Sequence, residues 1–402
     1  MSQIIRIGFL TGQSFMQRRN GNYYKLKQCI LIMQKTETLS ITNMTLTELE
    51  ALCVSMGEPA YRAKQMLSWI YEKRATSFDQ MSNLSKDFRR QLAEKYHLFQ
   101  THVGSITETA DGTEKFLMHL FDENVIESVL LREGKRITVC VSTQVGCAMG
   151  CRFCASGLLG LQRNLTTGEI VEQVLQVRNH LPIDERLTNI VFMGIGEPLA
   201  NYDNVVKAVR ILNAEWGLGI GIRNITISTV GIIDGIRRLA QEGLQVNLAI
   251  SLHAPDDIIR TKIVPSNRKT GISAIIAAAQ EYFKATHRDI SFEYVLIDGV
   301  NASKRDAETL ALLLNDIQCN INILPVNPVE EFNWKTPSEE TIAMFCNTLE
   351  RHGLTVTCRK RKGDDIHAAC GQLRLQRHKN NLHEENTVSG ELSPAVTDKT
   401  HQ

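Results

Sequence analysis

The chain has 402 residues, of which 43% are hydrophobic and 22% are charged, as in an ordinary soluble globular protein with room for two or three domains. Its formal net charge of +1 excludes a global attraction to nucleic acid, so any contact with RNA must come from local patches. No apolar run approaches the roughly 18 residues of a membrane span, and ten cysteines are too sparse for a disulfide scaffold.

The first forty residues show no clear periodicity and carry six Lys or Arg before the first acid, Glu37. We interpret residues 1–43 as a loosely ordered basic extension. A charge inside the only candidate apolar segment, and the lack of a small-residue cleavage site after it, argue against a signal peptide. Met1, Met33 and Met44 all remain open as the translation start.

Residues 44–100 carry a helical pattern, which predicts a small helical domain. A capping box of Thr45 with Glu48, or of Thr47 with Glu50, opens the first helix. Pro59 marks the start of a second helix, and a third follows Ser85. Basic residues occupy the remaining faces and are able to neutralise phosphates, although an ordinary solvated surface has the same composition: Arg62, Lys64, Lys73, Arg74, Lys86, Arg89 and Arg90.

Between residues 114 and 142 the hydrophobic period becomes two, which predicts three strands. They are KFLMHLF, NVIESVLLR and RITVCVS. In the second strand Glu127 shares a face with Val125 and Val129, an apolar setting that would raise its pKa and make it a candidate base. A solvent-facing edge position is the alternative. In the third strand, Cys140 points to the side opposite Val139.

Three cysteines, Cys147, Cys151 and Cys154, follow one another in the spacing CxxxCxxC. Soft sulfur ligands suit zinc, copper(I) or an iron-sulfur cluster. A closed zinc site needs a fourth ligand nearby, yet the next cysteine is Cys319 and the next histidine is His180. Three local ligands fit a four-iron cluster with one open iron, while a zinc knuckle or unrelated core thiols are the alternatives.

From residue 166 onward, short β-branched runs alternate with helical segments of ten or more residues. Thr166 and Glu169 are placed to form a capping box at the start of the first helix. The pattern predicts an α/β fold with a parallel sheet: an incomplete (β/α)6 barrel that resembles part of a TIM barrel. Its active groups should lie at the C-terminal ends of the strands. The segments that follow the strands contain Gly196, Glu197, Ser228, Ser251, Leu252, His253 and Asn327.

Near the C-terminus Cys370 lies between small residues in HAACGQ, which would let a bulky partner reach the sulfur. An inert core thiol is the alternative. The preceding run from Arg359 to Lys362 supplies charge for a polyanion. We therefore divide the chain into the extension 1–43, the helical domain 44–100, a core 101–373 and a polar, disordered tail 374–402.

These motifs carry a family resemblance. CxxxCxxC followed by βα repeats resembles the radical S-adenosylmethionine (SAM) enzymes, and the fuller set resembles the RlmN and Cfr family of radical SAM rRNA methyltransferases. The resemblance covers about residues 44–374 through VCVSTQVGCAMGCRFCASG, FMGIGEPLANY, ISTVGI, AISLHAP, IVPSN, LPVNP and GDDIHAACGQL. Pro198 in MGIGEP resembles the RlmN branch. Lys362 and His367 depart from the residues common in the family.

The resemblance implies one [4Fe-4S] cluster per chain, held by Cys147, Cys151 and Cys154, and two molecules of SAM per turnover. It implies that SAM lies against the strand-end residues named above, with Glu197 at its ammonium group. One SAM would methylate Cys370, and a second, reduced at the cluster, would start the radical transfer of that methyl group to adenine. Cys140 would release the product through a transient disulfide with Cys370, and Glu127 would accept a proton.

The implied reaction is methylation of carbon 2 of adenine in 23S rRNA, at the peptidyl-transferase centre, and in tRNA next to the anticodon. The resemblance also implies a flavodoxin-type reductase as electron donor. We expect a cytoplasmic monomer without a membrane partner. Two other readings stay open: a Cfr-like methyltransferase acting on carbon 8, and a non-catalytic iron-sulfur protein that binds RNA. The sequence does not rank rRNA against tRNA.

Overall fold

The computed structural model describes residues 40–158, 160–327, 329, 331–359 and 371–373. The expectations for most of the basic extension and for the polar tail fall outside these residues. Within them, no helix is both long and apolar enough to cross a membrane.

The helical region begins earlier than the sequence indicated, because Ser40 and the short helix η1 (Ile41–Asn43) are already part of it. Three longer helices follow: α2 (Leu46–Ser55), α3 (Arg62–Tyr71) and α4 (Lys86–Lys95), with the turn η2 (Phe78–Gln80) before the last. The capping box of Thr45 and Glu48 is confirmed at α2, and the Ser85 hydroxyl caps α4. Pro59 lies in a turn ahead of α3 and not at its first residue.

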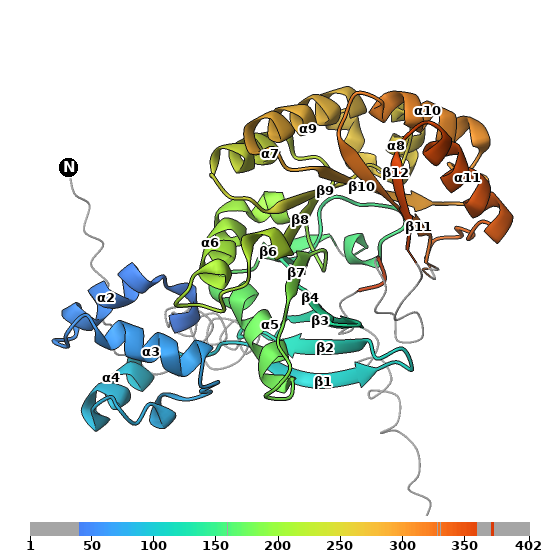
Figure 1. Cartoon of the computed structure of the whole chain (residues 1–402). Coiled ribbons are helices and arrows are strands. Elements are labelled where there is room, and N and C mark those ends of the chain that lie inside the picture. Colours follow the sequence, from blue (N-terminus) through green and yellow to red (C-terminus); the bar gives the residue numbers. More distant parts are fainter. Residues whose placement is uncertain (1–39, 159, 328, 330, 360–370, 374–402) are drawn as a thin grey trace, which may run out of the picture. The chain divides into compact units, whose positions relative to one another are not determined.

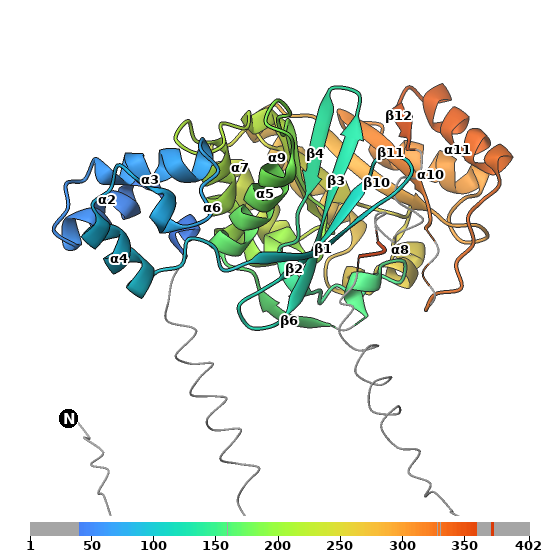
Figure 2. The same ribbon diagram turned by 90° about the horizontal axis from the view of Figure 1, so that it is seen from below.

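A buried carboxylate ties this region to the core. The Glu172 Oε1 accepts hydrogen bonds from the hydroxyls of Ser40 and Thr42, both at 2.6 Å. Its Oε2 accepts from the backbone N–H groups of Gln100 (2.9 Å) and Thr101 (2.7 Å). Burial raises the pKa of Glu172, and these four donors satisfy the carboxylate that burial would otherwise penalise. Figures 1 and 2 both show the helical region beside α5 (Thr167–His180) and α6 (Tyr202–Asn213).

One ten-stranded sheet forms the core of the described residues, in the order β1-β2-β3-β4-β7-β8-β9-β10-β11-β12. Its first part is antiparallel: β1 (His102–Glu108), β2 (Glu114–His119), β3 (Val125–Glu133) and β4 (Arg136–Cys140). From β4 onward every neighbouring pair is parallel: β7 (Asn189–Phe192), β8 (Ile225–Thr229), β9 (Asn247–Ser251), β10 (Ile290–Leu296), β11 (Cys319–Pro325) and β12 (Thr355–Cys358).

The predicted parallel α/β sheet with a helical region ahead of it is confirmed. The sheet remains open in the described part of the chain, because β1 and β12 are its two edges. Helices join the parallel strands, and Figure 1 shows most of them on the outer side of the curved sheet. Besides α5 and α6 they are α7 (Ile233–Gln241), α8 (Asp257–Ile263), α9 (Ile272–Thr286), α10 (Lys304–Leu314) and α11 (Glu339–Arg351). Thr166 and Glu169 form the predicted capping box of α5.

A second, two-stranded ladder lies at the base of the cysteine loop. It pairs β5 (Gln144–Gly146) with β6 (Leu161–Asn164) in antiparallel register. The segment that contains the three cysteines is therefore a loop closed by a hairpin, and its two ends are held together before any ligand binds.

Candidate active site

A cavity that is open to solvent lies at the C-terminal ends of the parallel strands. Its lining brings together most of the residues singled out in the sequence: Cys147, Cys151, Cys154, Gly196, Glu197, Ser228, Ser251, His253 and Asn327.

The turn into the cysteine loop depends on Gly146, whose φ is +77°. A Cβ atom there would lie 1.9 Å from the Gly160 carbonyl oxygen, so the two backbones approach more closely than a side chain allows. The Cys147 N–H donates to that same oxygen at 3.0 Å. The loop is thus closed at its neck by backbone contacts.

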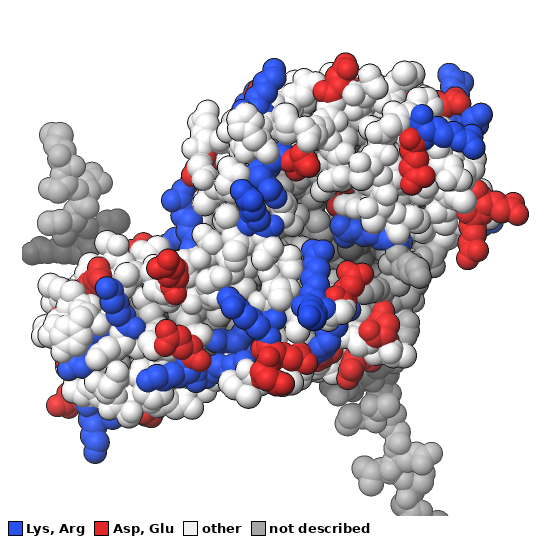
Figure 3. Space-filling view, in the orientation of Figure 1, with Lys and Arg blue, Asp and Glu red and all other residues white. Residues whose placement is uncertain are grey.

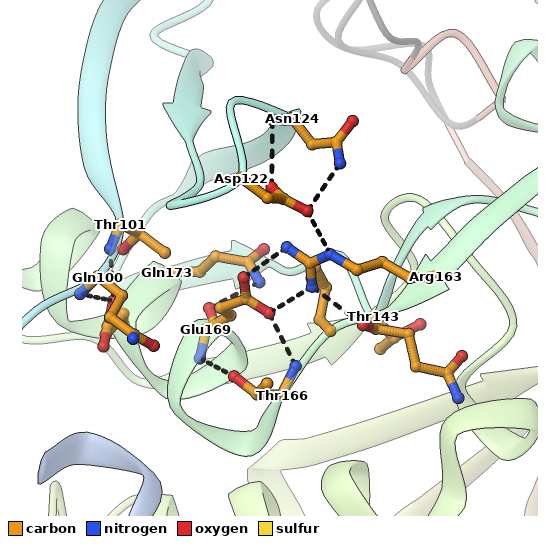
Figure 4. Close-up of polar contacts among 12 residues, drawn as sticks. Gln100, Thr101, Asp122, Asn124, Thr143, Arg163, Thr166, Glu169 and Gln173 are labelled. Atoms are coloured by element: carbon orange, nitrogen blue, oxygen red, sulfur yellow. Dashed lines mark hydrogen bonds and ion pairs between the residues drawn. The ribbon is translucent and has the colours of Figure 1, made fainter. Parts of the chain in front are cut away.

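Arg163 on β6 fixes this neck to the rest of the core (Figure 4). Its guanidinium donates to both carboxylate oxygens of Glu169, each at 2.8 Å, and to the Asp122 Oδ2 at 2.6 Å. Glu169 is in the first turn of α5, and Asp122 lies between β2 and β3. The guanidinium also lies over the ring of Phe121. One cation therefore joins the cysteine loop, the helix that follows it and the antiparallel strands.

The three cysteine thiols are partly or fully withdrawn from water. Burial raises the pKa of all three, and it raises that of Cys147 to about 12. The neighbouring thiols add to the effect for Cys147 and Cys151, since each disfavours a second negative charge. Binding of a positively charged centre must therefore displace the protons.

The chemistry of these residues fits an iron-sulfur cluster. All three thiols line the same cavity, and thiolates are the usual protein ligands of a four-iron cluster.

Glu197 lies on the cavity wall and is 2% exposed. Burial raises its pKa to about 7 despite hydrogen bonds that favour the charged form. Its Oε1 accepts from the Leu199 N–H (3.0 Å) and its Oε2 from the Val230 N–H (2.9 Å). The Thr229 hydroxyl is a third hydrogen-bond partner of this carboxylate, which is still able to accept one more donor from the cavity.

His253 faces the same cavity as a neutral imidazole. Its Nδ1 accepts a hydrogen bond from the Val295 N–H at 3.0 Å, which leaves the ring proton on Nε2. Burial, together with the charge of Arg260, lowers the pKa of His253 to about 3. The residue has a φ of +60°, and its ring packs edge-on against Phe153 in the cysteine loop. His253 is therefore a fixed hydrogen-bond donor and apolar surface, not a cation.

Leu252 is the predicted cavity residue that the structure places elsewhere. Its side chain is fully buried and does not line the cavity. Its backbone N–H donates to the Glu293 carbonyl oxygen at 3.0 Å, and its own carbonyl oxygen accepts from Arg260. Any role of Leu252 toward a ligand would have to be indirect, through the backbone that it holds.

Two cavity features were missed from the sequence. Glu293 on β10 lines the wall 3.6 Å from the guanidinium of Arg359, which the sequence analysis had assigned to a polyanion. Arg260 on α8 is 1% exposed and donates to the carbonyl oxygens of Val230 and Ser251, so it ties the ends of β8 and β9 together. For Glu293 the only available signal was a charged residue in a mostly apolar strand, and the sequence of α8 offers no such signal for Arg260.

Cys370 itself lies outside the described residues, but the three residues after it are described. The Gly371 carbonyl oxygen accepts from the Ala155 N–H (2.7 Å), and the Leu373 carbonyl oxygen accepts from the Ser156 hydroxyl (2.8 Å). Both donors belong to the cysteine loop. Gly371 also lines the cavity, and the Leu373 side chain packs in one cluster with Cys140. The segment that directly follows Cys370 is therefore held against the cysteine loop and the cavity.

Cys140 and Glu127 do not line the cavity. Cys140 packs with Val129 and Ile195, on the opposite side of β4 from the Val139 side chain, as the strand pattern predicted. Glu127 is 1% exposed, which excludes the solvent-facing alternative. Its carboxylate lies 3.2 Å from the Lys115 ammonium group, on the neighbouring strand β2.

Several cations of the helical region have local partners. Arg62 lies 3.5 Å from the Glu58 carboxylate, Arg74 donates to the Leu181 carbonyl oxygen, and Arg90 pairs with Glu94. On the face drawn in Figure 3, Lys and Arg of this region are interspersed with Asp and Glu. A continuous basic patch is therefore not visible on that face of the helical region.

Two family models match the chain. Residues 39–98 match the ribosomal RNA large subunit methyltransferase N-terminal domain, and residues 141–311 match the radical SAM superfamily. The second match includes the cysteine loop and the strand ends from β7 to β10 that surround the cavity.

Curated relatives cover most of the chain. A probable dual-specificity RNA methyltransferase RlmN from Rhodopirellula baltica is 48% identical over 84% of this chain and 91% of its own length. One from Symbiobacterium thermophilum is 44% identical over 87% of this chain and 95% of its own length. The crystal structure of a radical SAM methyltransferase from Sphaerobacter thermophilus superposes with a TM-score of 0.82 at 46% identity, over 84% of this chain and 99% of that one.

Proposed function

This chain belongs to the RlmN family of radical SAM RNA methyltransferases, and on that premise we propose that it methylates carbon 2 of adenine in 23S rRNA and in tRNA. The rRNA target is an adenine at the peptidyl-transferase centre, and the tRNA target is the adenine next to the anticodon. The curated relatives are named as dual-specificity RNA methyltransferases, which supports two RNA substrates.

The radical SAM superfamily implies a [4Fe-4S] cluster and SAM. Cys147, Cys151 and Cys154 are the residues that would hold the cluster, one per chain. Bound there, the cluster and SAM supply the one-electron chemistry that an aromatic carbon of low nucleophilicity requires. The loop's contribution is to present three sulfurs and to exclude a fourth protein ligand from the cavity side.

The strand ends would hold SAM. Glu197 accepts its ammonium group, while Ser228, Ser251 and Asn327 offer polar contacts along the same wall. Gly196, with a φ of +111°, leaves no room for a side chain because its Cβ would lie 2.7 Å from Gln144. The His253 Nε2–H is a further donor into the cavity. Two molecules of SAM are used in each turnover.

Three residues perform the transfer to RNA. Cys370 carries the methyl group as a thioether and becomes bonded through that carbon to the adenine. The radical adduct gives up one electron, which would return to the cluster, and Glu127 takes a proton from it. The Cys140 thiolate then attacks the Cys370 sulfur, and the bond between that sulfur and the transferred carbon breaks with its electron pair on the carbon. That carbon takes up a proton to become the methyl group of the product, and a disulfide between the two cysteines remains. Support for this assignment comes from the short segment after Cys370, which is hydrogen-bonded to the cysteine loop and packs on Cys140.

The remaining partners follow from this chemistry. Each turnover consumes electrons, so we assign a flavodoxin-type reductase as donor and a cytoplasmic, reducing compartment in which the cysteines can be regenerated. The chain acts as a monomer. RNA is bound by cations of the helical region that have no local ion pair and by Lys360, Arg361 and Lys362. Arg359 is instead paired with Glu293. The adenine must leave its stack to reach the cavity.

The contacts of Gly371 to Leu373 are the observation that carries this proposal, because they bring the neighbourhood of Cys370 to the cavity. The test is mass spectrometry of methyladenosine isomers in rRNA and tRNA from a knockout strain complemented with this chain. We expect 2-methyladenosine in both RNAs. The 8-methyl isomer would assign a Cfr-like activity instead, and no methylation by fully cluster-loaded protein would indicate a non-catalytic RNA-binding role.

A further inference from the structure

Lys115 and Glu127 form a buried ion pair on the antiparallel part of the sheet. The ammonium nitrogen lies 3.2 Å from the Glu127 Oε1, and the two side chains are 8% and 1% exposed. A buried pair of this kind is not needed for stability, because apolar residues of similar size often serve as well or better. Stability alone therefore does not account for the pair.

The strand register shows which face the pair occupies. Lys115 is directly opposite Val129 on β3, and Val129 is directly opposite Cys140 on β4. Side chains opposite one another in a ladder point to the same face, and Glu127 is two residues from Val129. The ion pair thus shares a face with Cys140, which packs against Leu373.

The register places two titratable residues of β2 on this face beside Glu127: Lys115, which forms the ion pair, and His119, which stacks on His102 of β1. From β4 the face carries Cys140, while Glu133 and Arg136 lie opposite one another at the far end of the ladder. The Glu114 carboxylate and its partners Arg132 and His180 occupy the opposite face, since Glu114 pairs with Leu130. The helix α5 also packs there, where Gln173 accepts from the Ser128 hydroxyl.

The segment after Cys370 contributes the apolar Leu373 to this face. Residues 360–370, which include Asp364, Asp365 and His367, lie outside the described residues.

Burial raises the pKa of a carboxyl group and favours its neutral form, which is unable to accept a proton, unless a cation or hydrogen-bond donors compensate. We propose that Lys115 is a positioning residue for the methyl transfer: its ammonium group keeps Glu127 ionised and fixes it in place until it receives the proton from the adenine adduct. This inference rests on the proposed role of Glu127. In the step itself the adduct's C–H bond breaks, its electron pair stays with the substrate, and Glu127 changes from carboxylate to neutral acid beside the lysine cation.

The test compares Lys115→Met with wild-type enzyme, both loaded with cluster and SAM, in single-turnover methyl transfer to RNA between about pH 6 and about pH 8.5. Without the ammonium group Glu127 should ionise only at higher pH, so the acid limb of the profile should move upward. We expect a loss of at least about tenfold at pH 6 that shrinks to about threefold or less at pH 8.5. The matched control is Lys304→Met, which removes an exposed lysine paired with Glu308.

A Lys115→Met profile that has the wild-type shape would overturn the inference. Glu127→Gln separates this failure from a failure of the proposed function. If Glu127→Gln is inactive at every pH while the Lys115→Met profile is unchanged, Glu127 remains the acceptor and Lys115 has no part. If Glu127→Gln is fully active, the assignment of Glu127 is itself wrong, and the inference is lost with it.

A second measurement covers the case in which Lys115→Met folds poorly. The double variant Lys115→Met/Glu127→Gln removes both charges, and its thermal midpoint should recover toward that of wild type, because no uncompensated buried charge remains. Additive losses of thermal stability in the double variant would show that the two side chains do not form a functional pair and would contradict the inference.

Discussion

His253 illustrates how burial sets the chemistry of a single side chain at this site. Its imidazole is neutral in the folded protein because burial and Arg260 lower its pKa from 6.5 to about 3. In the unfolded chain the same ring takes up a proton as the pH falls below about 6.5. The stability that neutral His253 contributes is therefore present above that pH and is lost progressively as the pH falls toward 3.

We predict that His253→Asn reduces the acid sensitivity of the fold. Asparagine tolerates the positive φ at this position and keeps a hydrogen-bond acceptor for the Val295 N–H. Between pH 7 and pH 5 wild type should lose roughly 2 kcal/mol of unfolding free energy from this group, and the variant should not. Urea unfolding of the cluster-free protein at the two pH values measures the difference. His287→Asn, at an exposed residue with a φ of +53°, is the control and should behave like wild type.

Gly371 directly follows Cys370, and a substitution of Gly371 tests the contact between this segment and the cysteine loop. Its φ is +86°, and a Cβ atom would lie 2.8 Å from the Phe153 carbonyl oxygen. Gly371→Ala should therefore push the segment away from the cysteine loop, and methylation of Cys370, read by intact-protein mass, should fall about tenfold or more. Gly353→Ala has a similar φ of +82° but open space around it, and it should leave that methylation unchanged. Equal effects of the two substitutions would contradict the contact.

At the residue scale, sequence reasoning succeeded where residues were marked by an unusual spacing or followed a strand. The cysteines, Glu197, Ser228, Ser251 and His253 meet in one cavity for that reason. Glu293 is a single charged residue in a mostly apolar strand, whereas Arg260 is one of three charged residues in α8. Both were missed because only the tertiary structure shows what they contact. Leu252 was grouped with its neighbours Ser251 and His253 at the end of a strand. Alternate side chains of a strand point to opposite faces, however, so the Leu252 side chain does not share the cavity with them.

At the scale of elements, all seven parallel strands of the described sheet and the helices between them were anticipated from hydrophobic period and capping residues. The edge strand β1 was not, because most of its side chains are exposed and no alternation of apolar residues marks it. The β5–β6 hairpin was missed for a different reason. Its strands are three and four residues long, and glycine contacts and the Arg163 ion pairs define it more than periodicity does.

The β5–β6 hairpin closes the loop that carries the three cluster cysteines, so we expect it to control how firmly the cluster is held. We predict that Arg163→Met, which removes the ion pairs to Asp122 and Glu169, loosens the neck of the cysteine loop. Iron release to a chelator from the reconstituted protein, followed by absorbance, should accelerate on the order of tenfold, as for other residues that orient metal ligands. Arg237→Met removes an exposed ion pair to Glu281 and should release iron at the wild-type rate. Identical rates for Arg163→Met and wild type would show that the hairpin does not control cluster retention.

At the scale of the whole molecule, buried polar contacts join parts that are distant in sequence. Glu172 connects the helical region to the core, Arg163 connects the cysteine loop to the antiparallel strands, and Ser156 connects that loop to Leu373 near the C-terminus. None of these pairings is visible from local patterns, because each depends on two segments meeting in the fold. The order of helices and strands could therefore be predicted from the sequence. The contacts that join the cysteine loop to the rest of the core could not.

The central claim is that Cys370 carries the methyl group to RNA and that Cys140 releases the product. The most direct measurement is denaturing gel analysis, with intact mass, of protein–RNA adducts in Cys140→Ala and Cys370→Ala proteins after turnover. Cys140→Ala should accumulate a covalent adduct, because the bond from Cys370 to the base forms and is not resolved, whereas Cys370→Ala should form none. Adducts at equal levels in both proteins, or in neither, would contradict the account.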